Sequence, residues 1–463
     1  MPHTCCKAIF KASTSIYSHI SNYVSNLQSN PPSNSKPYLK HIIVALFAIY
    51  LAFSIPNVLE TKRVYDVVSH GYIWSDIAVV GGTIKAFYGG QPNPYDRQQV
   101  VAAMAAEGYT GFVPAPFVYF PIYFLLFGWL QWLSFTQIFV LDFLLHIALW
   151  LHLAFFIAKQ KAWANIGFGL PQSLTVSGAI FFGFLNQGNY LIGTINIYLF
   201  YGFFLWLLTM RSQLALASNS LVLLISTLKF GFFLALVPIM ALHLRRLWPA
   251  IGIAAVIFIG YSLYSQPLWQ YYSAFSQEIF TDHYSMGGVN LGDKNISLYG
   301  NYFRLQYVLK AAFGIQLHLL PIFKVVTALG LLAFGLILYR WRAQPAKIYS
   351  LSLLAVCFGF LLFPITWLEY LPLLFIALLV DGALNDRLPS ALLSILAMGL
   401  AAVIISFTPI SMAEGNVLWP KALFLAISTL PTLVLLAIGY SSLRFAAAGI
   451  SQPEAVPAAA SQA

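Results

Sequence analysis

The chain has 463 residues, of which 60% are hydrophobic and only 8% are charged, and its mean hydropathy is +0.78. A soluble globular protein carries about 25% charged residues, so this composition excludes a soluble globular protein of this length. The net charge of +10 does not indicate nucleic-acid binding, because the basic residues form short clusters between apolar runs, as they do in the loops of membrane proteins. Three cysteines are too few for a disulfide framework or a metal set.

Long apolar runs predict the fold class. Each approaches the roughly 20 residues that a bilayer-spanning helix needs, and lipid offers the backbone no hydrogen-bonding partner. We therefore expect an all-α, polytopic membrane helix bundle with about 11 to 13 transmembrane helices. The longest runs lie at 42–59, 116–133, 136–158, 316–339, 389–408 and 422–440.

In chain order, residues 1–40 predict a polar cytoplasmic lead, and the run at 42–59 is expected to act as an uncleaved anchor. The transmembrane domain is expected to cover 41–445, and residues 446–463 form an Ala-, Ser- and Pro-rich tail that we expect to be disordered.

Two long polar segments, 60–115 and 267–315, are expected to be loops on the same outer face. The clusters of basic residues lie in other loops, and basic residues favour the inner face of a membrane. A tight turn at 133–137 separates the second and third apolar runs. The helices from 172 to 266 are expected to be short and interrupted by polar residues, and the topology of 116–244 is left open.

Ionisable residues near membrane depth are costly and are functional candidates by default. For Lys229 the alternatives are snorkelling to an interface and binding an anion such as a lipid phosphate. Asp142 and His146 are interpreted as a buried hydrogen-bonded pair rather than a site. The full set of candidates is Asp76, Asp142, Lys229, Lys324, Glu369 and Asp381.

Asp76 has both a structural and a catalytic interpretation. It is a good helix N-cap before the apolar run 77–88, which Gly89 and Gly90 would end. A carboxylate at the outer membrane face can instead serve as a general base. Asp96 could simply close a turn, and Asp381 with Asp386 and Arg387 is interpreted as a loop anchor.

The order of several weak motifs resembles glycosyltransferase family 87, membrane enzymes of the GT-C class. The motifs are Asp76 followed by Gly89-Gly90 and Pro94-Tyr95-Asp96; the helix start Tyr119-Phe120-Pro121; Gly193-Thr194-Ile195-Asn196 followed by Lys229; and Asn295-Ile296-Ser297 followed by Pro364 to Tyr370. This chain departs from the family at Val80, where a tyrosine is usual, and at Phe230, where proline is usual.

The resemblance implies transfer of a hexose, with mannose expected, from a polyprenyl-phosphate sugar to a glycan or glycolipid acceptor at the plasma (inner) membrane, facing the outside or periplasm. It implies that Asp76 is the general base of an inverting reaction and that Lys229 and Arg304 bind the donor phosphate. The residues expected to bind sugar or acceptor are Tyr95, Asp96, Asn196, Asn295, Trp367 and Glu369. No cofactor and no metal site are expected, although a role for a divalent cation is left open.

A transporter or flippase of lipid-linked sugars is the main alternative, since it would share the apolar helices and the intramembrane lysine. The chain lacks the matched halves that such transporters commonly show. An O-antigen-type polymerase is a third possibility. Such enzymes typically rely on arginines in their outer loops, and the arginines of this chain are too few and scattered to favour it. Motifs for ATP-driven transport, zinc hydrolysis and serine hydrolysis are absent from the sequence.

Overall fold

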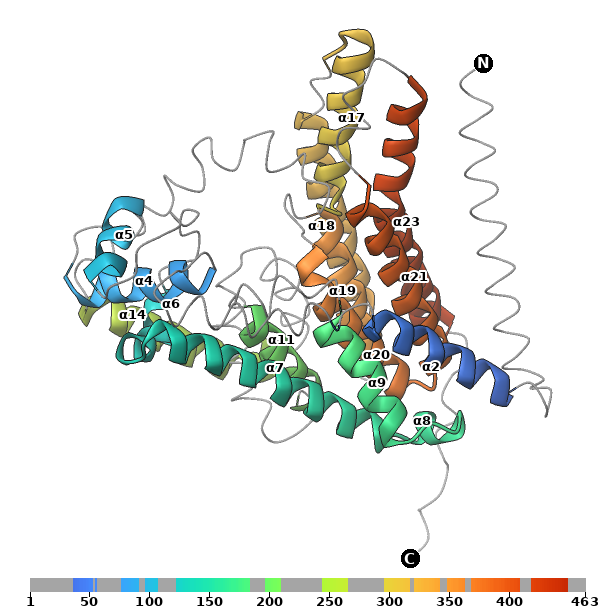
Figure 1. Cartoon of the computed structure of the whole chain (residues 1–463), viewed down its shortest axis with the longest axis horizontal. Coiled ribbons are helices and arrows are strands. Elements are labelled where there is room, and N and C mark those ends of the chain that lie inside the picture. The colour runs from blue at the N-terminus through green and yellow to red at the C-terminus, as the bar shows by residue number, and fades with distance from the viewer. Residues whose placement is uncertain are drawn as a thin grey trace, which may run out of the picture.

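The computed structural model describes residues 36–52, 55, 76–90, 96–106, 122–183, 196–209, 244–264, 295–316, 320–341, 348–362, 368–408 and 418–448. Within these ranges all the regular elements are helices, which confirms the all-α fold class (Figure 1). Of the predicted lead 1–40, residues 1–35 lie outside the described residues, and 36–40 are helical and begin α2 (Lys36–Ala52). Of the predicted tail 446–463, residues 449–463 lie outside the described residues, and 446–448 are helical and end α23 (Leu418–Ala448).

Among the described residues, three helices are long and apolar enough to cross a membrane: α7 (Phe135–Ala158), α21 (Leu388–Ser406) and α23 (Leu418–Ala448). They correspond to three of the predicted apolar runs and identify the chain as a helical membrane protein. Shorter or less apolar helices accompany them, and the predicted number of spans stays a prediction. These are α2 (Lys36–Ala52), α9 (Leu170–Phe182), α11 (Asn196–Thr209), α14 (Leu244–Tyr264), α18 (Leu320–Trp341), α19 (Ile348–Leu362) and α20 (Leu371–Leu384).

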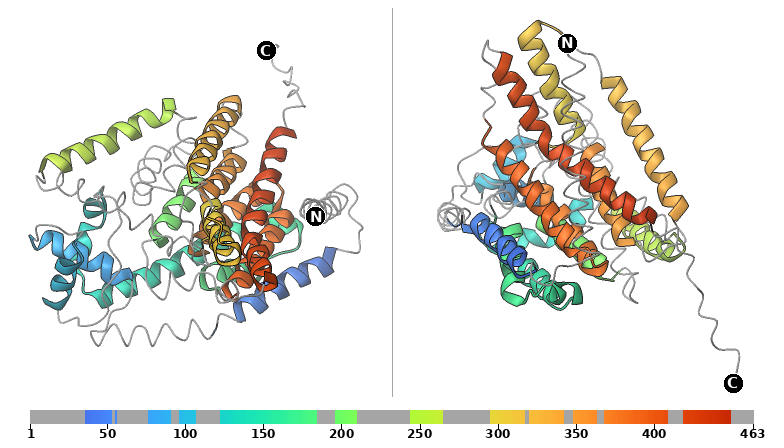
Figure 2. Two further views of the ribbon diagram at one scale, coloured as in Figure 1. Left: turned by 90° about the horizontal axis from the view of Figure 1, so that it is seen from above. Right: turned by 90° about the vertical axis from the view of Figure 1, so that its right-hand side faces the viewer.

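One hydrophobic core joins buried residues of α2, α7, α9 and α11 to the helices of the C-terminal part. Helix α19 packs against both α20 and α23, and α21 packs against the same two helices. Nearly every residue of α20 from Leu371 to Ala383 is buried, as expected for a helix that is apolar all round and surrounded by others. Helix α17 (Leu298–Phe313) runs along the upper part of α23 (Figures 1 and 2).

A second group of short helices lies at the other end of the molecule in Figure 1. It consists of α4 (Asp76–Tyr88), α5 (Arg97–Ala106), α6 (Ile122–Phe127) and the 3-10 helix η1 (Gly128–Trp132), and the last three pack around α4. The short helix α8 (Lys161–Asn165) follows the other end of α7 and packs against α20. Helix α4 also packs against α7, which links this group to the rest of the chain.

Local sequence signals fix several helix ends. Ser134 and Gln137 form a reciprocal capping box at the start of α7, at the predicted turn. Helix α4 ends at Tyr88, and Gly89 and Gly90 follow, with Gly90 at φ 78°, so the predicted helix and its glycine stop are confirmed.

The apolar run at 116–133 is predicted to be one membrane-crossing helix, and the structure describes its residues 122–133. They form the six residues of α6 followed by η1, rather than one continuous α-helix. The Tyr88 hydroxyl donates to the Phe124 carbonyl oxygen at 2.8 Å. That carbonyl is the acceptor that the Gly128 N–H would use if α6 continued, so the bond from α4 competes with further α-helix.

Candidate functional site

The expected site residues are distributed over several parts of the chain. Lys229, Tyr95 and Trp367 lie outside the described residues, as do the side chains of Asp76 and Lys324. Asp76 is the first residue of α4, in agreement with its predicted place at a helix start.

Asp96 lies at the start of α5. Its carboxylate accepts a hydrogen bond from the Gln98 backbone N–H at 2.8 Å and another from Gln99 Nε2 at 3.2 Å. These bonds to residues two and three positions ahead are those of an N-terminal helix cap. They match the turn-closing interpretation, and the role in binding a sugar stays a prediction.

Arg304 lies in the contact between α17 and α23, which we call the α17–α23 seam. Its side chain is fully buried. Nη2 donates to Asn301 Oδ1 at 2.5 Å and to the Ser428 carbonyl oxygen of α23 at 3.3 Å. Because a buried guanidinium group loses its hydration, these bonds orient the charge and partly replace the lost water.

A second layer of polar bonds continues the seam toward the start of α17. Asn301 Nδ2 donates to Thr432 Oγ1 at 2.6 Å, and the Thr432 hydroxyl donates to the Ile296 carbonyl oxygen at 2.7 Å. One threonine of α23 thus joins both the first turns of α17 and the segment before it.

The Asn-x-Ser segment forms the beginning of α17. The Ser297 N–H donates to Asn295 Oδ1 at 3.1 Å, and the Ser297 hydroxyl accepts from the Gly300 N–H at 3.1 Å. Asn295 is fully buried, and a Cβ atom at Gly300 would lie 2.6 Å from the Asn295 carbonyl oxygen. Asn295 therefore lies tightly against the first turn of α17, which also explains why helix begins here within the predicted outer loop.

Two further expected residues lie beside α20. Asn196 is buried at the start of α11, and Glu369 lies half-buried in the 3-10 helix η4 (Leu368–Tyr370). Both elements pack against α20.

The structure therefore brings Asn295 and Arg304 together at the seam, and Asp76 and Asp96 together in the α4–α5 group. These two groups lie apart in Figure 1 and in the view from above in Figure 2.

The Asp142–His146 pair is buried one turn apart on α7, as predicted. His146 Nδ1 lies 2.9 Å from the Asp142 carbonyl oxygen and 3.5 Å from Asp142 Oδ2.

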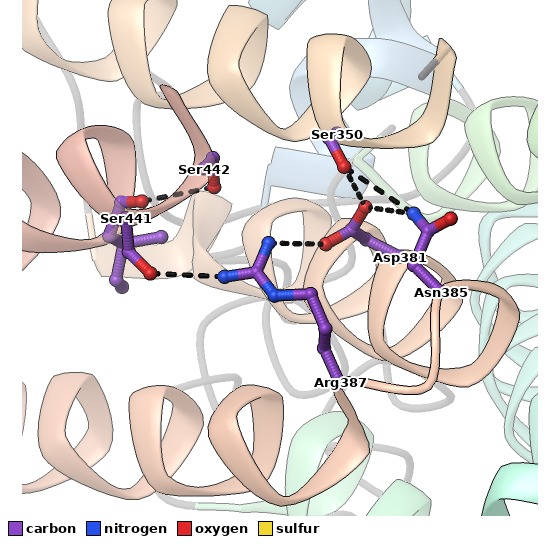
Figure 3. A network of polar contacts seen from close by, with 7 residues as sticks. Ser350, Asp381, Asn385, Arg387, Ser441 and Ser442 are labelled. Carbon is purple, nitrogen blue, oxygen red and sulfur yellow. Dashed lines mark hydrogen bonds and ion pairs between the residues drawn. The ribbon is translucent and has the colours of Figure 1, made fainter. Parts of the chain in front are cut away.

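A buried polar network lies where α20 turns into α21 (Figure 3). Asp381 Oδ1 accepts from Ser350 Oγ of α19 at 2.6 Å and from Asn385 Nδ2 at 2.7 Å. Arg387 Nη2 donates to Ser441 Oγ of α23 at 3.0 Å. The network joins four helices by side chains that are occupied with one another, which confirms the interpretation as an anchor.

Lys421 is a residue that sequence reasoning missed. It lies in the first turn of α23 and is only 2% exposed. The predicted apolar run begins at 422, so Lys421 lies just before it. A lysine beside Trp419 and Pro420 is typical of a membrane interface, and its burial by other elements has no signal in the local sequence.

The described part of the chain contains no group of three or more His, Cys, Asp or Glu side chains placed to hold a metal ion. Comparison of the sequence and fold with protein-family profiles, curated proteins and solved structures finds no match.

Proposed function

We propose that this membrane protein is a glycosyltransferase of the GT-C type that moves a hexose, mannose first among the candidates, from a polyprenyl-phosphate carrier to a glycan or glycolipid acceptor. The active site would face the outside or periplasm from the plasma (inner) membrane. The observation that carries the proposal is Arg304, a fully buried cation at a helix seam of an apolar protein.

Arginine suits a phosphate ligand for two reasons. Its planar guanidinium group presents several N–H donors in a fork that matches phosphate oxygens, and it stays charged when buried. The bonds from Nη2 to Asn301 and Ser428 hold the plane of the group in position. A charged side chain that is fully buried among the helices of an apolar protein is costly, which favours a functional role.

In the proposed reaction, an acceptor hydroxyl attacks the anomeric carbon while Asp76 takes its proton. The bond between that carbon and the phosphate oxygen breaks, and the electron pair leaves with the polyprenyl phosphate. Configuration is inverted in this single step, and Arg304 and Lys229 would stabilise the growing charge on the leaving phosphate.

This mechanism requires Asp76 and Arg304 to act on the same sugar. Because α4 and α17 lie apart in this structure, the mechanism requires the two helices to approach each other when donor and acceptor are bound. A cysteine pair at Tyr88 of α4 and Leu305 of α17, both exposed, tests this: donor lipid and acceptor should raise the yield of a bifunctional cross-link.

The direct test is transfer of radiolabelled sugar from synthetic polyprenyl-phosphate mannose to a membrane extract by the purified protein. Asp76→Asn should lower the rate about 10²- to 10⁴-fold, the range for loss of a general base. Asp386→Asn is the matched control, because Asp386 lies in the α20–α21 turn at φ 53°, a conformation that asparagine also accepts.

Equal rates for wild type and Asp76→Asn would remove Asp76 from the mechanism. Movement of the lipid-linked sugar between leaflets of a vesicle, without transfer from any of several donor sugars, would replace the proposal with a flippase.

A further inference from the structure

The Asp142 carboxyl group is buried in α7 with an unmet demand for hydrogen bonds. Its Oδ2 atom is covered and has no hydrogen-bond partner among the described residues. His146, one turn later, does not meet this demand, because its Nδ1 lies 2.9 Å from the Asp142 carbonyl oxygen but 3.5 Å from Oδ2. A charge-assisted bond from N–H to a carboxylate measures about 2.7–2.9 Å. The two residues are therefore joined through the backbone, which leaves the carboxyl group to be explained.

This carboxyl group lies within the apolar part of the molecule. Asp142 is seven residues beyond Phe135, the first residue of α7, and so lies about 10 Å along the helix axis from it. It belongs to the buried face of this candidate span, in line with Ile138 and Leu149, and is only 3% exposed. A carboxylate in this place is removed from water and faces other helices, which makes its charge costly.

The helices that pack against α7 in the described part of the chain, namely α4, α8, α9, α11 and α20, bring no lysine or arginine to Asp142. Lys85 of α4 donates to a backbone carbonyl just before α7, and Lys161 of α8 is exposed beyond the other end of α7. Helix α9 contains no titratable residue, and Asp381 of α20 is held by its own network. Of the described basic side chains, His146 alone comes within 4 Å of the Asp142 carboxylate. The other titratable residues of α7 and of these helices are His152, Asp76, Tyr88, Tyr198 and Tyr201.

Tyr198 of α11 brings a second unsatisfied polar atom to the same place. Its hydroxyl is buried without a hydrogen-bond partner among the described residues, and it is close enough to Asp142 for the two to interact electrostatically. The buried Tyr123 of α6 lies near Tyr198 in the same sense. Further along the contact of α7 and α11, His152 Nδ1 lies 3.2 Å from the Tyr201 hydroxyl, so these two groups engage each other. A neutral phenol can bond to an acid but cannot balance the charge of a carboxylate.

Two proton arrangements keep Asp142 and His146 neutral overall. One is a carboxylic acid beside a neutral imidazole, and the other is an ion pair of carboxylate and imidazolium. A buried ion pair offsets the lost hydration only when its geometry is excellent and further hydrogen bonds support it. Here the carboxylate would have one contact at 3.5 Å and an Oδ2 atom without a donor. The neutral acid costs less, and its O–H is a donor that the Tyr198 oxygen can accept.

We propose that Asp142 is a proton-binding site of the membrane domain, with a proton on its carboxyl group at neutral pH that exchanges with water along the contact of α7 and α11. Release breaks the O–H bond, leaves the electron pair on the carboxylate and passes the proton to water. Because the remaining charge has no lysine or arginine partner among the described residues, release should loosen α7 from α11 and rebinding should close the contact. The proposal does not depend on sugar transfer, since the proton itself is observed.

The test is infrared absorption of the full-length protein in lipid bilayers at neutral pH, first in H2O and then in D2O. A protonated carboxylic acid has a C=O stretching band that is separate from the bands of carboxylates and of the backbone amides. We expect such a band in the wild type, its loss in Asp142→Asn, and its shift to lower frequency in D2O. Asparagine matches the shape and the neutrality of the acid, so this variant should unfold at the wild-type temperature.

Asp381→Asn is the matched control. Asp381 is also 3% exposed, but its carboxylate accepts a hydrogen bond from Ser350 and is paired with Arg387. Its replacement should therefore leave the acid band in place. Tyr198→Phe should keep the band and change its frequency, because the hydroxyl that the acid faces is removed.

Several results would overturn the proposal. The absence of an acid band in the wild type, or a band that survives in Asp142→Asn, would show that Asp142 holds no proton. A band that does not shift after hours in D2O would indicate a sealed acid that exchanges no proton with water. An Asp142→Asn variant that fails to fold, or that unfolds far below the wild-type temperature, would indicate an ion pair with His146 instead of a neutral acid.

Discussion

Arg387 and Asp381 form an ion pair across the turn between α20 and α21, with Arg387 Nη1 3.6 Å from Asp381 Oδ2 and the carboxylate buried (Figure 3). The guanidinium group also lies over the Phe445 ring, 4.2 Å from its centroid. A single pair thus connects the end of one helix to the last third of α23.

Asp381→Ala should therefore destabilise the protein strongly. It leaves Arg387 without the partner carboxylate and removes an acceptor from Ser350 and Asn385, and loss of one partner of a buried pair costs about 3–5 kcal/mol. The measurement is unfolding in detergent of both single variants and of Asp381→Ala/Arg387→Met. Losses that simply add would contradict a coupled pair, for which the double variant should lose less than the sum.

Thr432→Val tests the α17–α23 seam. The substitution keeps the shape but removes the hydroxyl that accepts from Asn301 and donates to the Ile296 carbonyl. The buried Ile296 carbonyl and the half-buried Asn301 amide then lose this partner. We expect a loss of about 1–3 kcal/mol in the free energy of unfolding. Thr429→Val is the control, because the Thr429 hydroxyl bonds only to its own helix and is exposed. Similar effects of both changes would show that the seam bonds contribute little.

The helices of the C-terminal part could be predicted from sequence, since an apolar run in lipid has few alternatives to a helix. Helix α17 could not, because Asn301, Arg304 and Lys310 make it resemble a polar loop. The groups that satisfy Asn301 and Arg304 lie more than a hundred positions away on α23, and no local pattern reports such a contact.

The candidate site was predictable to the same limited degree. The Asn295 and Ser297 pattern indicated a feature of interest, and the structure adds that Ser297 caps α17 while Asn295 accepts from the N–H of this cap residue. Lys421 carried no such signal, because a lysine at the edge of an apolar run usually reaches water. Its burial depends on tertiary packing alone.

Two glycines of neighbouring helices should respond in opposite directions to alanine. A Cβ atom at Gly382 would lie 2.7 Å from the Ala391 Cβ and 3.2 Å from the Leu388 Cα, so α20 and α21 would have to separate. Gly382→Ala should cost about 1–3 kcal/mol. Gly399 in α21 meets nothing within 4 Å, and Gly399→Ala should stabilise by about 0.5–1 kcal/mol. Thermal unfolding of both variants measures this, and a stabilised Gly382→Ala would contradict the close approach.

The lipid-facing side of α21 can be tested by its tolerance of charge. Leu400 is 63% exposed within the apolar helix, and Phe407 is exposed at its end. If α21 spans the bilayer, Leu400→Arg places a guanidinium group inside the hydrocarbon region. Such a charge raises the free energy of insertion by up to about 3 kcal/mol at the centre of a helix.

Phe407→Arg is the matched change, since an arginine at a helix end can reach the interface and should be tolerated. The measurement is the fraction of each variant recovered in alkali-washed membranes, with an engineered glycosylation site after α21 to report whether the helix inserted. Insertion should fall several-fold for Leu400→Arg alone. Equal recovery of the two variants would show that the exposed face of α21 meets water or another protein rather than lipid, and the span assigned to this helix would then be wrong.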